Sequence, residues 1–128
     1  MPTPDQIRTT VTAYAQAMSS GDKQGWVALF APDATVEDPV GAEVRTGHEQ
    51  IGEFWDFVHT LSAEIAFEVH GPVRIAGSEA AFAGRAVSGA GDERLAVDLV
   101  DVMAFDDEGR ITSLRAFWGP ENMGPLEG

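Results

Sequence analysis

The sequence predicts an α+β fold, with three helices in the first half of the chain and a sheet of consecutive strands in the second half. Up to about residue 60, apolar side chains recur at the spacing of one helical face, whereas from about residue 63 they alternate with polar ones. Short segments rich in Gly, Asp and Ser separate the alternating stretches and are typical of tight turns. The 128 residues suit a single domain with one core over residues 1–128.

Three stretches with helical spacing define the predicted helices. The first begins at Pro4 and ends at Ser19–Gly21, and its core face carries Ile7, Val11, Tyr14 and Met18. The second is short, is capped by Asp22 and is broken at Pro32, and it presents Trp26, Leu29 and Phe30. The third follows a Gly-containing loop, and its apolar face carries Ile51, Phe54, Trp55 and Val58.

Strands are predicted wherever the apolar period is two. A short strand covers residues 34–40, between the second and third helices. Five more strands follow, at residues 63–70, 71–77, 79–88, 94–105 and 110–119. Because tight turns join these consecutive strands, we expect an antiparallel meander. The tail from about residue 119 is rich in Gly and Pro, and we expect it to be irregular.

The composition argues against several classes of binding partner and binding site. A net charge of −13 argues against nucleic acids and anionic membranes, because both attract basic surfaces. The chain has no cysteine, which excludes disulfides and zinc–thiolate sites. His48, His59 and His70 lack metal-ligand spacing, so we expect them on the surface, with no metal and no cofactor. The sequence shows no signal-peptide pattern and no apolar run of membrane-spanning length, and we expect a cytoplasmic protein.

The stretch AVDLVDVMAF, residues 96–105, places two aspartates in an otherwise apolar strand. Because side chains alternate along a strand, Asp98 and Asp101 must point to opposite faces. Asp101 shares its face with Leu99 and Met103, which predicts an enclosed carboxyl group. Such a group is either paired with a cation such as Arg115 or kept neutral by a raised pKa. A neutral carboxyl group is also a hydrogen-bond donor, and in a dry pocket it can stabilise an oxyanion.

Three stretches of the sequence carry a specific pattern of ionisable residues. They are AYAQAMSSGD with Tyr14, DATVEDPVG with Asp38, and VDVMAFDDEGRI with Asp101, followed by RAFWGPEN. In this order and spacing they closely resemble the bacterial Δ5-3-ketosteroid isomerases, from about residue 4 to about residue 123. DATVEDPVG is the specific part of the pattern, whereas many proteins of the same fold carry a turn similar to DDEGRI.

The resemblance implies a nuclear-transport-factor-like, or cystatin-like, fold. In that fold, a curved antiparallel sheet forms a cone around the three helices and encloses a deep apolar pocket. The resemblance also implies a homodimer packed through the outer face of the sheet. The strand at residues 94–105 is apolar on both faces, so Val100 and Val102 would meet the partner copy.

The resemblance also assigns a role to each of the three ionisable groups. Asp38 would be the general base, which takes a proton from the carbon next to the steroid carbonyl and returns it two carbons further on. Tyr14 and a neutral Asp101 would form the oxyanion hole and donate hydrogen bonds to the carbonyl oxygen as it becomes negative. The substrate implied is a small apolar steroid, isomerised from the Δ5 to the Δ4 form without a cofactor.

Apolar pocket walls are implied in the same way, because a steroid offers mainly hydrocarbon. The residues that match wall positions are Phe54, Phe82, Leu99, Met103, Ala116 and Trp118. The chain departs from the pattern of the family in one respect. Members of the family often have a second tyrosine that supports the one matching Tyr14, whereas Tyr14 is the only tyrosine of this chain. The matching positions here hold Trp55 and Phe30, which have no hydroxyl group.

Other interpretations of the same residues remain open. Tyr14 suits an ordinary core position, Asp38 suits a turn before Pro39, and the wall residues suit ordinary core packing. A second class of function is a polyketide cyclase or hydratase-type enzyme of the same fold, in which the pocket acid is usually paired with His or Arg. A third is a non-catalytic module that binds an apolar ligand, since one fold serves many functions.

Overall fold

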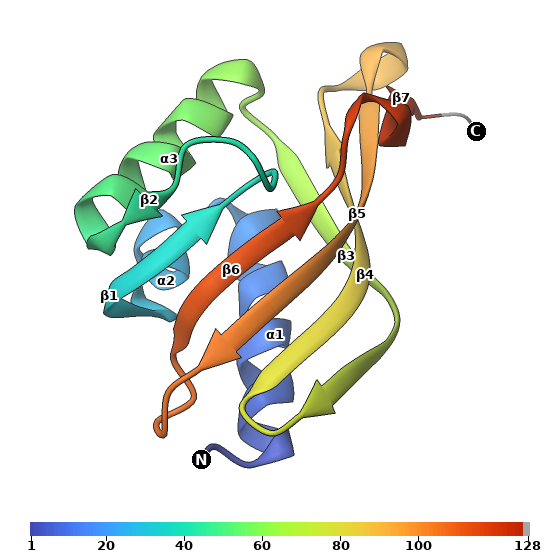
Figure 1. Cartoon of the computed structure of the whole chain (residues 1–128). Helices are drawn as coiled ribbons and strands as arrows, with labels where there is room; N and C mark the ends of the chain where they lie inside the picture. The colour runs from blue at the N-terminus through green and yellow to red at the C-terminus, as the bar shows by residue number, and fades with distance from the viewer. Residues whose placement is uncertain (127–128) are drawn as a thin grey trace.

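The computed structural model describes residues 1–126 of the chain. It contains three α-helices, α1 (Pro4–Ser20), α2 (Lys23–Ala28) and α3 (Gly47–Leu61). In Figure 1, α1 and α2 lie behind a curved sheet, and α3 lies along its upper left side. Helix α1 begins with a reciprocal capping box between Thr3 and Gln6, which satisfies two of the N–H groups that a helix start leaves free. The predicted α+β fold with three helices is confirmed.

Seven strands of the described residues 1–126 form one sheet. Its order is β2–β1–β6–β5–β4–β3, and the short strand β7 pairs with β5. The bounds are β1 Phe30–Glu37, β2 Arg45–Thr46, β3 Ile65–Ala76, β4 Glu79–Ser88, β5 Leu95–Phe105, β6 Ile111–Phe117 and β7 Met123–Pro125. Strands β3 to β6 are consecutive antiparallel neighbours, which confirms the predicted meander. Two short 3₁₀ turns cover Gly91–Glu93 and Pro120–Asn122.

One pairing corrects the prediction of a wholly antiparallel sheet. Strand β1 pairs with β6 in parallel, with Val36 opposite Leu114, so the sheet is mixed. The two strands are separated by the third helix and the whole meander, and no tight turn joins them. A tight turn forces the two strands that it joins to be antiparallel, and no such turn constrains this pair.

Three predicted boundaries are also wrong. The two strands predicted at residues 63–70 and 71–77 are one strand, β3, whose register shifts between His70 and Arg74. Gly71, at φ 73°, bends the strand there without ending it. Phe30 belongs to β1 and not to the second helix. The tail is not wholly irregular, because β7 adds Met123–Pro125 to the edge of β5.

The core lies between the helices and the concave face of the sheet. Ile7, Val11 and Tyr14 enter it from α1, and Trp26 enters it from α2, all with at most 2% of their surface exposed. The core face of α1 therefore agrees with the predicted spacing. None of the helices in residues 1–126 combines the length and the apolar character that crossing a membrane requires.

Candidate active site

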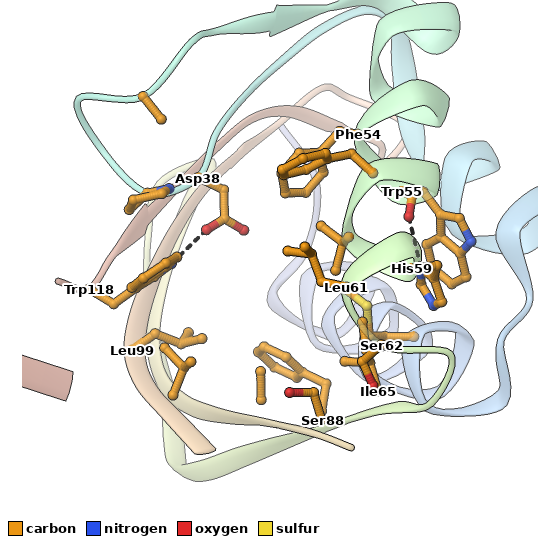
Figure 2. Close-up of a pocket in the computed structure, with 18 of the residues that line it drawn as sticks. Asp38, Phe54, Trp55, His59, Leu61, Ser62, Ile65, Ser88, Leu99 and Trp118 are labelled. Atoms are coloured by element: carbon orange, nitrogen blue, oxygen red, sulfur yellow. Dashed lines mark hydrogen bonds between the residues drawn. The ribbon is translucent and has the colours of Figure 1, made fainter. Parts of the chain in front are cut away.

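A cavity of about 540 Å³ opens between the helices and the concave face of the sheet. Its lining is mostly apolar, as Figure 2 shows for part of it. The apolar lining includes Met18, Trp26, Phe54, Trp55, Val58, Leu61, Ile65, Phe67, Val97, Leu99 and Trp118. Tyr14, Asp38 and Asp101 border the same cavity. The fold therefore brings together the three ionisable residues that the sequence singles out, from α1, from the end of β1 and from β5.

Asp38 follows the last residue of β1, and its carboxylate points into the cavity (Figure 2). The indole N–H of Trp118 donates a hydrogen bond of 2.7 Å to Asp38 Oδ1. Burial raises the pKa of Asp38, and the hydrogen bond from Trp118 lowers it. Asp38 is half-buried, and it keeps one donor that favours its ionised form.

Asp101 lies in the middle of β5 and is only 2% exposed. Its neighbours are the apolar residues Phe82 and Ala116 on the adjacent strands and Leu99 and Met103 along its own strand. Within residues 1–126, its Oδ2 atom is buried without a hydrogen-bond partner. Burial raises the pKa of Asp101 well above its ordinary value, and the charge of Asp38 raises it further. These surroundings favour the neutral carboxylic acid.

The two aspartates of β5 differ as the strand alternation predicts. Asp98 points to the outer face, where its carboxylate accepts hydrogen bonds of 2.7 and 3.1 Å from Arg85. The cation considered as a partner for Asp101, Arg115, instead donates to Glu37 at 3.2 Å. The prediction that Asp98 and Asp101 face opposite sides is therefore confirmed, and pairing of Asp101 with Arg115 is excluded.

Tyr14 projects from α1 into an aromatic cluster and is 2% exposed. Its ring centroid lies 5.4 Å from that of Phe67 and 5.8 Å from that of Trp26. Burial raises the pKa of Tyr14 well above its ordinary value, and the charges of Asp101 and Asp38 add to this effect. The Trp26 side chain acts to lower this pKa as a hydrogen-bond donor, although within residues 1–126 its indole nitrogen forms no hydrogen bond of full geometry.

The surroundings of the three groups favour different protonation states, although the groups share one cavity. Asp38 has a donor for its charged form, whereas Asp101 has apolar neighbours on its own and the adjacent strands and an oxygen without a hydrogen-bond partner within residues 1–126. The charge of Asp38 in turn disfavours ionisation of both Asp101 and Tyr14. The arrangement supplies one carboxylate able to accept a proton and two O–H groups able to donate hydrogen bonds.

The predicted wall residues separate into two groups. Phe54, Leu99 and Trp118 line the cavity. Phe82, Met103 and Ala116 lie in the core instead, at most 2% exposed, and they surround Asp101. Sequence reasoning placed Trp118 only as a wall and missed the hydrogen bond of its N–H to Asp38. It also missed Phe67 and Leu61, which line the cavity from β3 and from the end of α3.

His59 is the one histidine of the chain that borders the cavity, which corrects its predicted surface position. Its ring stacks on Trp55 with centroids 4.3 Å apart. Its Nδ1 lies 2.8 Å from the backbone oxygen of Trp55, one turn earlier in α3. Residues four apart lie on the same face of a helix, so the spacing of Trp55 and His59 indicated that these two side chains are neighbours.

Comparison with known proteins places this fold and cavity in a family. The family described as the SnoaL-like domain matches residues 11–114. The chain belongs to this family. The matched range of this SnoaL-like domain includes Tyr14, Asp38 and Asp101, and it ends before Trp118.

Two individual proteins are similar to this SnoaL-like domain over nearly its whole length. A protein of Nocardioides simplex named Steroid Delta-isomerase is 41% identical over 118 residues, which cover 92% of this chain and 94% of that protein. The solved structure of SalBIII, an epoxide hydrolase/cyclase-like enzyme of pyran ring formation in the polyether salinomycin, superposes with a TM-score of 0.88 at 30% identity. It covers 98% of this chain and 100% of that one. The resemblance to ketosteroid isomerases is confirmed, and the isomerase class of enzyme agrees with the first relative's name.

The enclosure of Asp101 predicts a pH-dependent contribution to the stability of this SnoaL-like domain. Below the ordinary pKa of an aspartate, about 3.9, Asp101 is protonated in both the folded and the unfolded chain. At higher pH the unfolded chain releases this proton while the folded protein keeps it, because the folded-state pKa is raised. The free energy of unfolding then falls by up to about 1.4 kcal/mol per pH unit.

The substitution Asp101→Asn removes this titration. We expect the variant to gain free energy of unfolding relative to the wild type as the pH rises from about 4 towards neutrality. Urea denaturation at a series of pH values measures the difference between the two proteins. A difference that stays constant over this range would mean that Asp101 ionises in the folded protein as an ordinary surface aspartate does.

Proposed function

We propose that the protein isomerises Δ5-3-ketosteroids to Δ4-3-ketosteroids by moving one proton within the substrate, without a cofactor. The observation that supports this most strongly is the asymmetry of the two cavity carboxyl groups. Asp38 accepts a hydrogen bond from Trp118, whereas Asp101 is buried among apolar side chains and borders the same cavity as the phenol of Tyr14. The similarity to the Steroid Delta-isomerase of Nocardioides simplex supports the same reaction.

The proposed reaction has two proton transfers. The ionised carboxylate of Asp38 takes a proton from C4 of the steroid, and the electrons of the C–H bond form a dienolate with negative charge on the C3 oxygen. The O–H groups of Tyr14 and Asp101 donate hydrogen bonds to this oxygen. Asp38 then returns the proton to C6, the double bond moves into conjugation with the carbonyl group, and Asp38 is ionised again.

The cavity suits this substrate and this chemistry. Its volume of about 540 Å³ and its apolar lining match a rigid hydrocarbon ligand with few polar groups. Exclusion of water strengthens the hydrogen bonds that Tyr14 and Asp101 make to a developing negative charge. The same dry surroundings keep Asp101 neutral, and a neutral acid is required if it is to be a donor.

Incubation with 5-androstene-3,17-dione tests the proposal. We expect the ultraviolet absorbance of the conjugated enone to increase with time in proportion to the protein concentration. Binding of the steroid without this increase would instead indicate an apolar-ligand carrier. Neither binding nor conversion would reject a steroid as the ligand.

A second candidate function is cyclisation of a polyketide or polyether intermediate. It is favoured by the similarity to SalBIII, which covers the whole of that chain. A cyclase of this fold is expected to pair its pocket acid with His or Arg. Within residues 1–126, neither Asp38 nor Asp101 forms an ion pair with a cationic side chain. This favours the isomerase over the cyclase.

We also propose that the protein forms a homodimer through the outer face of the sheet. Val100 and Phe117 are directly opposite each other on β5 and β6, and they are 42% and 43% exposed. Val100 is also opposite Ala83 of β4, and Arg115 stacks over the Phe117 ring at 5.3 Å. An exposed apolar patch on a sheet face suits a self-complementary contact between two copies.

A charge in this patch is expected to separate the two copies. We expect the wild type to sediment at twice the chain mass of 13.6 kDa at micromolar concentration. The substitution Val100→Lys is expected to raise the dimer dissociation constant about a hundredfold or more, because two-fold symmetry places both new charges in one interface. Thr9→Lys, on the exposed side of α1, is the control and leaves the dimer intact. A wild type that sediments as a monomer would contradict the proposal.

A further inference from the structure

Trp26 is enclosed at the centre of the aromatic cluster beside the cavity. It is 0% exposed, and within residues 1–126 its indole nitrogen is buried without a hydrogen-bond partner of full geometry. A buried N–H group without a partner is unfavourable, and such groups are rare in folded proteins. The buried N–H of Trp26 is therefore expected to have a hydrogen-bond acceptor among its neighbours.

Three aromatic side chains pack around Trp26 at the border of the cavity. Ring centroids lie 4.9 Å from Trp26 for Phe30, 5.2 Å for Trp55 and 5.8 Å for Tyr14. Phe30 has no polar side-chain atom, and the indole of Trp55 is a donor only. The Tyr14 hydroxyl is thus the one acceptor among these three side chains. Hydrogen bonding from the Trp26 side chain also acts to lower the pKa of Tyr14, against the larger effect of burial.

We propose that Trp26 is a positioning residue, whose N–H donates to the Tyr14 oxygen and directs the Tyr14 hydrogen into the cavity. An indole N–H is a donor only, so Tyr14 has no means of turning its own hydrogen towards Trp26. A hydroxyl partner would not impose this direction, because a hydroxyl group both donates and accepts. Tyr14 is the only tyrosine of the chain, so Trp26 supplies the donor that no second phenol provides.

The contact is expected to tighten when an oxyanion occupies the cavity. As Tyr14 donates to a negative oxygen, its own oxygen becomes a better acceptor, and hydrogen bonds in such a chain strengthen one another. Catalytic hydrogen bonds are often long in a ligand-free protein and shorten in the complex. This inference rests on the proposed function, because it assumes that Tyr14 binds an oxyanion.

Removal of the N–H alone gives the sharpest test. Trp26→Phe would leave a hole in the core, so the better variant replaces Trp26 with its benzothienyl analogue, in which sulfur takes the place of N–H and the shape is kept. The probe is 2-naphtholate, supplied at a pH at which free 2-naphthol is ionised, with naphthalene as the uncharged control. We expect the affinity for naphtholate to fall about threefold to tenfold, with the affinity for naphthalene unchanged within about twofold.

The same replacement in the Tyr14→Phe protein separates positioning from packing. If Trp26 acts through the Tyr14 oxygen, removal of its N–H has no further effect on naphtholate binding in the Tyr14→Phe protein. An equal loss in both proteins, or no loss in either, would overturn the inference. Turnover of the steroid is not needed for this measurement, so failure of the isomerase assay and failure of the role of Trp26 remain distinguishable.

A measurement without any ligand tests the same contact. The three tryptophans give three indole N–H signals in a proton–nitrogen correlation spectrum. We expect Tyr14→Phe to shift the Trp26 signal upfield, because its acceptor is lost, and to leave the Trp118 signal in place because its partner is Asp38. A Trp26 signal that does not move would contradict the proposed contact.

Discussion

Asp38→Asn is expected to lower kcat for 5-androstene-3,17-dione by about 10²–10⁴-fold, with little change in KM. The amide has almost the same shape as the carboxylate, and its oxygen still accepts the hydrogen bond from Trp118. It is, however, far too weak a base to take a proton from carbon. The variant therefore removes the proton transfer while it keeps the packing at the end of β1. Steady-state kinetics on purified wild type and variant measure the effect.

A matched control lies on the same strand. Asp33 is an exposed residue of β1, and Asp33→Asn makes the same change of charge away from the cavity. We expect it to keep kcat within about twofold of the wild type, since isolated surface substitutions have small effects. A full rate in Asp38→Asn, or an equal loss in both variants, would show that Asp38 is not the base.

Replacement of Asp101 is expected to have the second-largest effect, and its size is expected to depend on the new side chain. Asp101→Leu removes a donor from the proposed oxyanion hole, and we expect kcat to fall about 10²–10³-fold. Asp101→Asn keeps an N–H donor in the same place, so we expect a loss of about tenfold or less. This order follows only if the native group is a neutral donor, because an ionised carboxylate has no hydrogen to donate.

Asp98 offers the control for this pair of variants. It lies on the same strand, but it faces the outer side of the sheet, where it pairs with Arg85. Asp98→Asn is expected to leave kcat within about twofold of the wild type, because the ion pair is exposed. If Asp101→Asn were as slow as Asp101→Leu, the protein would need a negative charge at this position, and the account of a neutral Asp101 would be wrong.

Local periodicity was enough to predict several features of the molecule. The helical spacing that places Tyr14 beside Ile7 and Val11 is confirmed by the core face of α1. The alternation along residues 94–105 correctly separates Asp98 from Asp101, because the side chains of a strand alternate whatever its neighbours are. The segments that join consecutive strands from β3 to β6 contain turn-forming residues. These residues predict that the two strands on either side of each turn are antiparallel.

Features that depend on distant parts of the chain were not predicted. The parallel pairing of β1 with β6 joins segments that no turn connects, so no local pattern indicates it. The hydrogen bond from Trp118 to Asp38 joins residues 80 positions apart. Trp26 has the pattern of an ordinary core residue, and only its position against Tyr14 distinguishes it. The roles of Tyr14, Asp38 and Asp101 came from the resemblance and remain proposals that the geometry supports.

Carbon-13 NMR of the aspartate side-chain carboxyl carbons tests the central claim most directly. Asp38→Asn and Asp101→Asn assign the two cavity signals, each by the loss of one resonance. The account predicts that at neutral pH the carbon of Asp101 has the chemical shift of a carboxylic acid, while that of Asp38 has the shift of a carboxylate. An ionised Asp101 at neutral pH would contradict it.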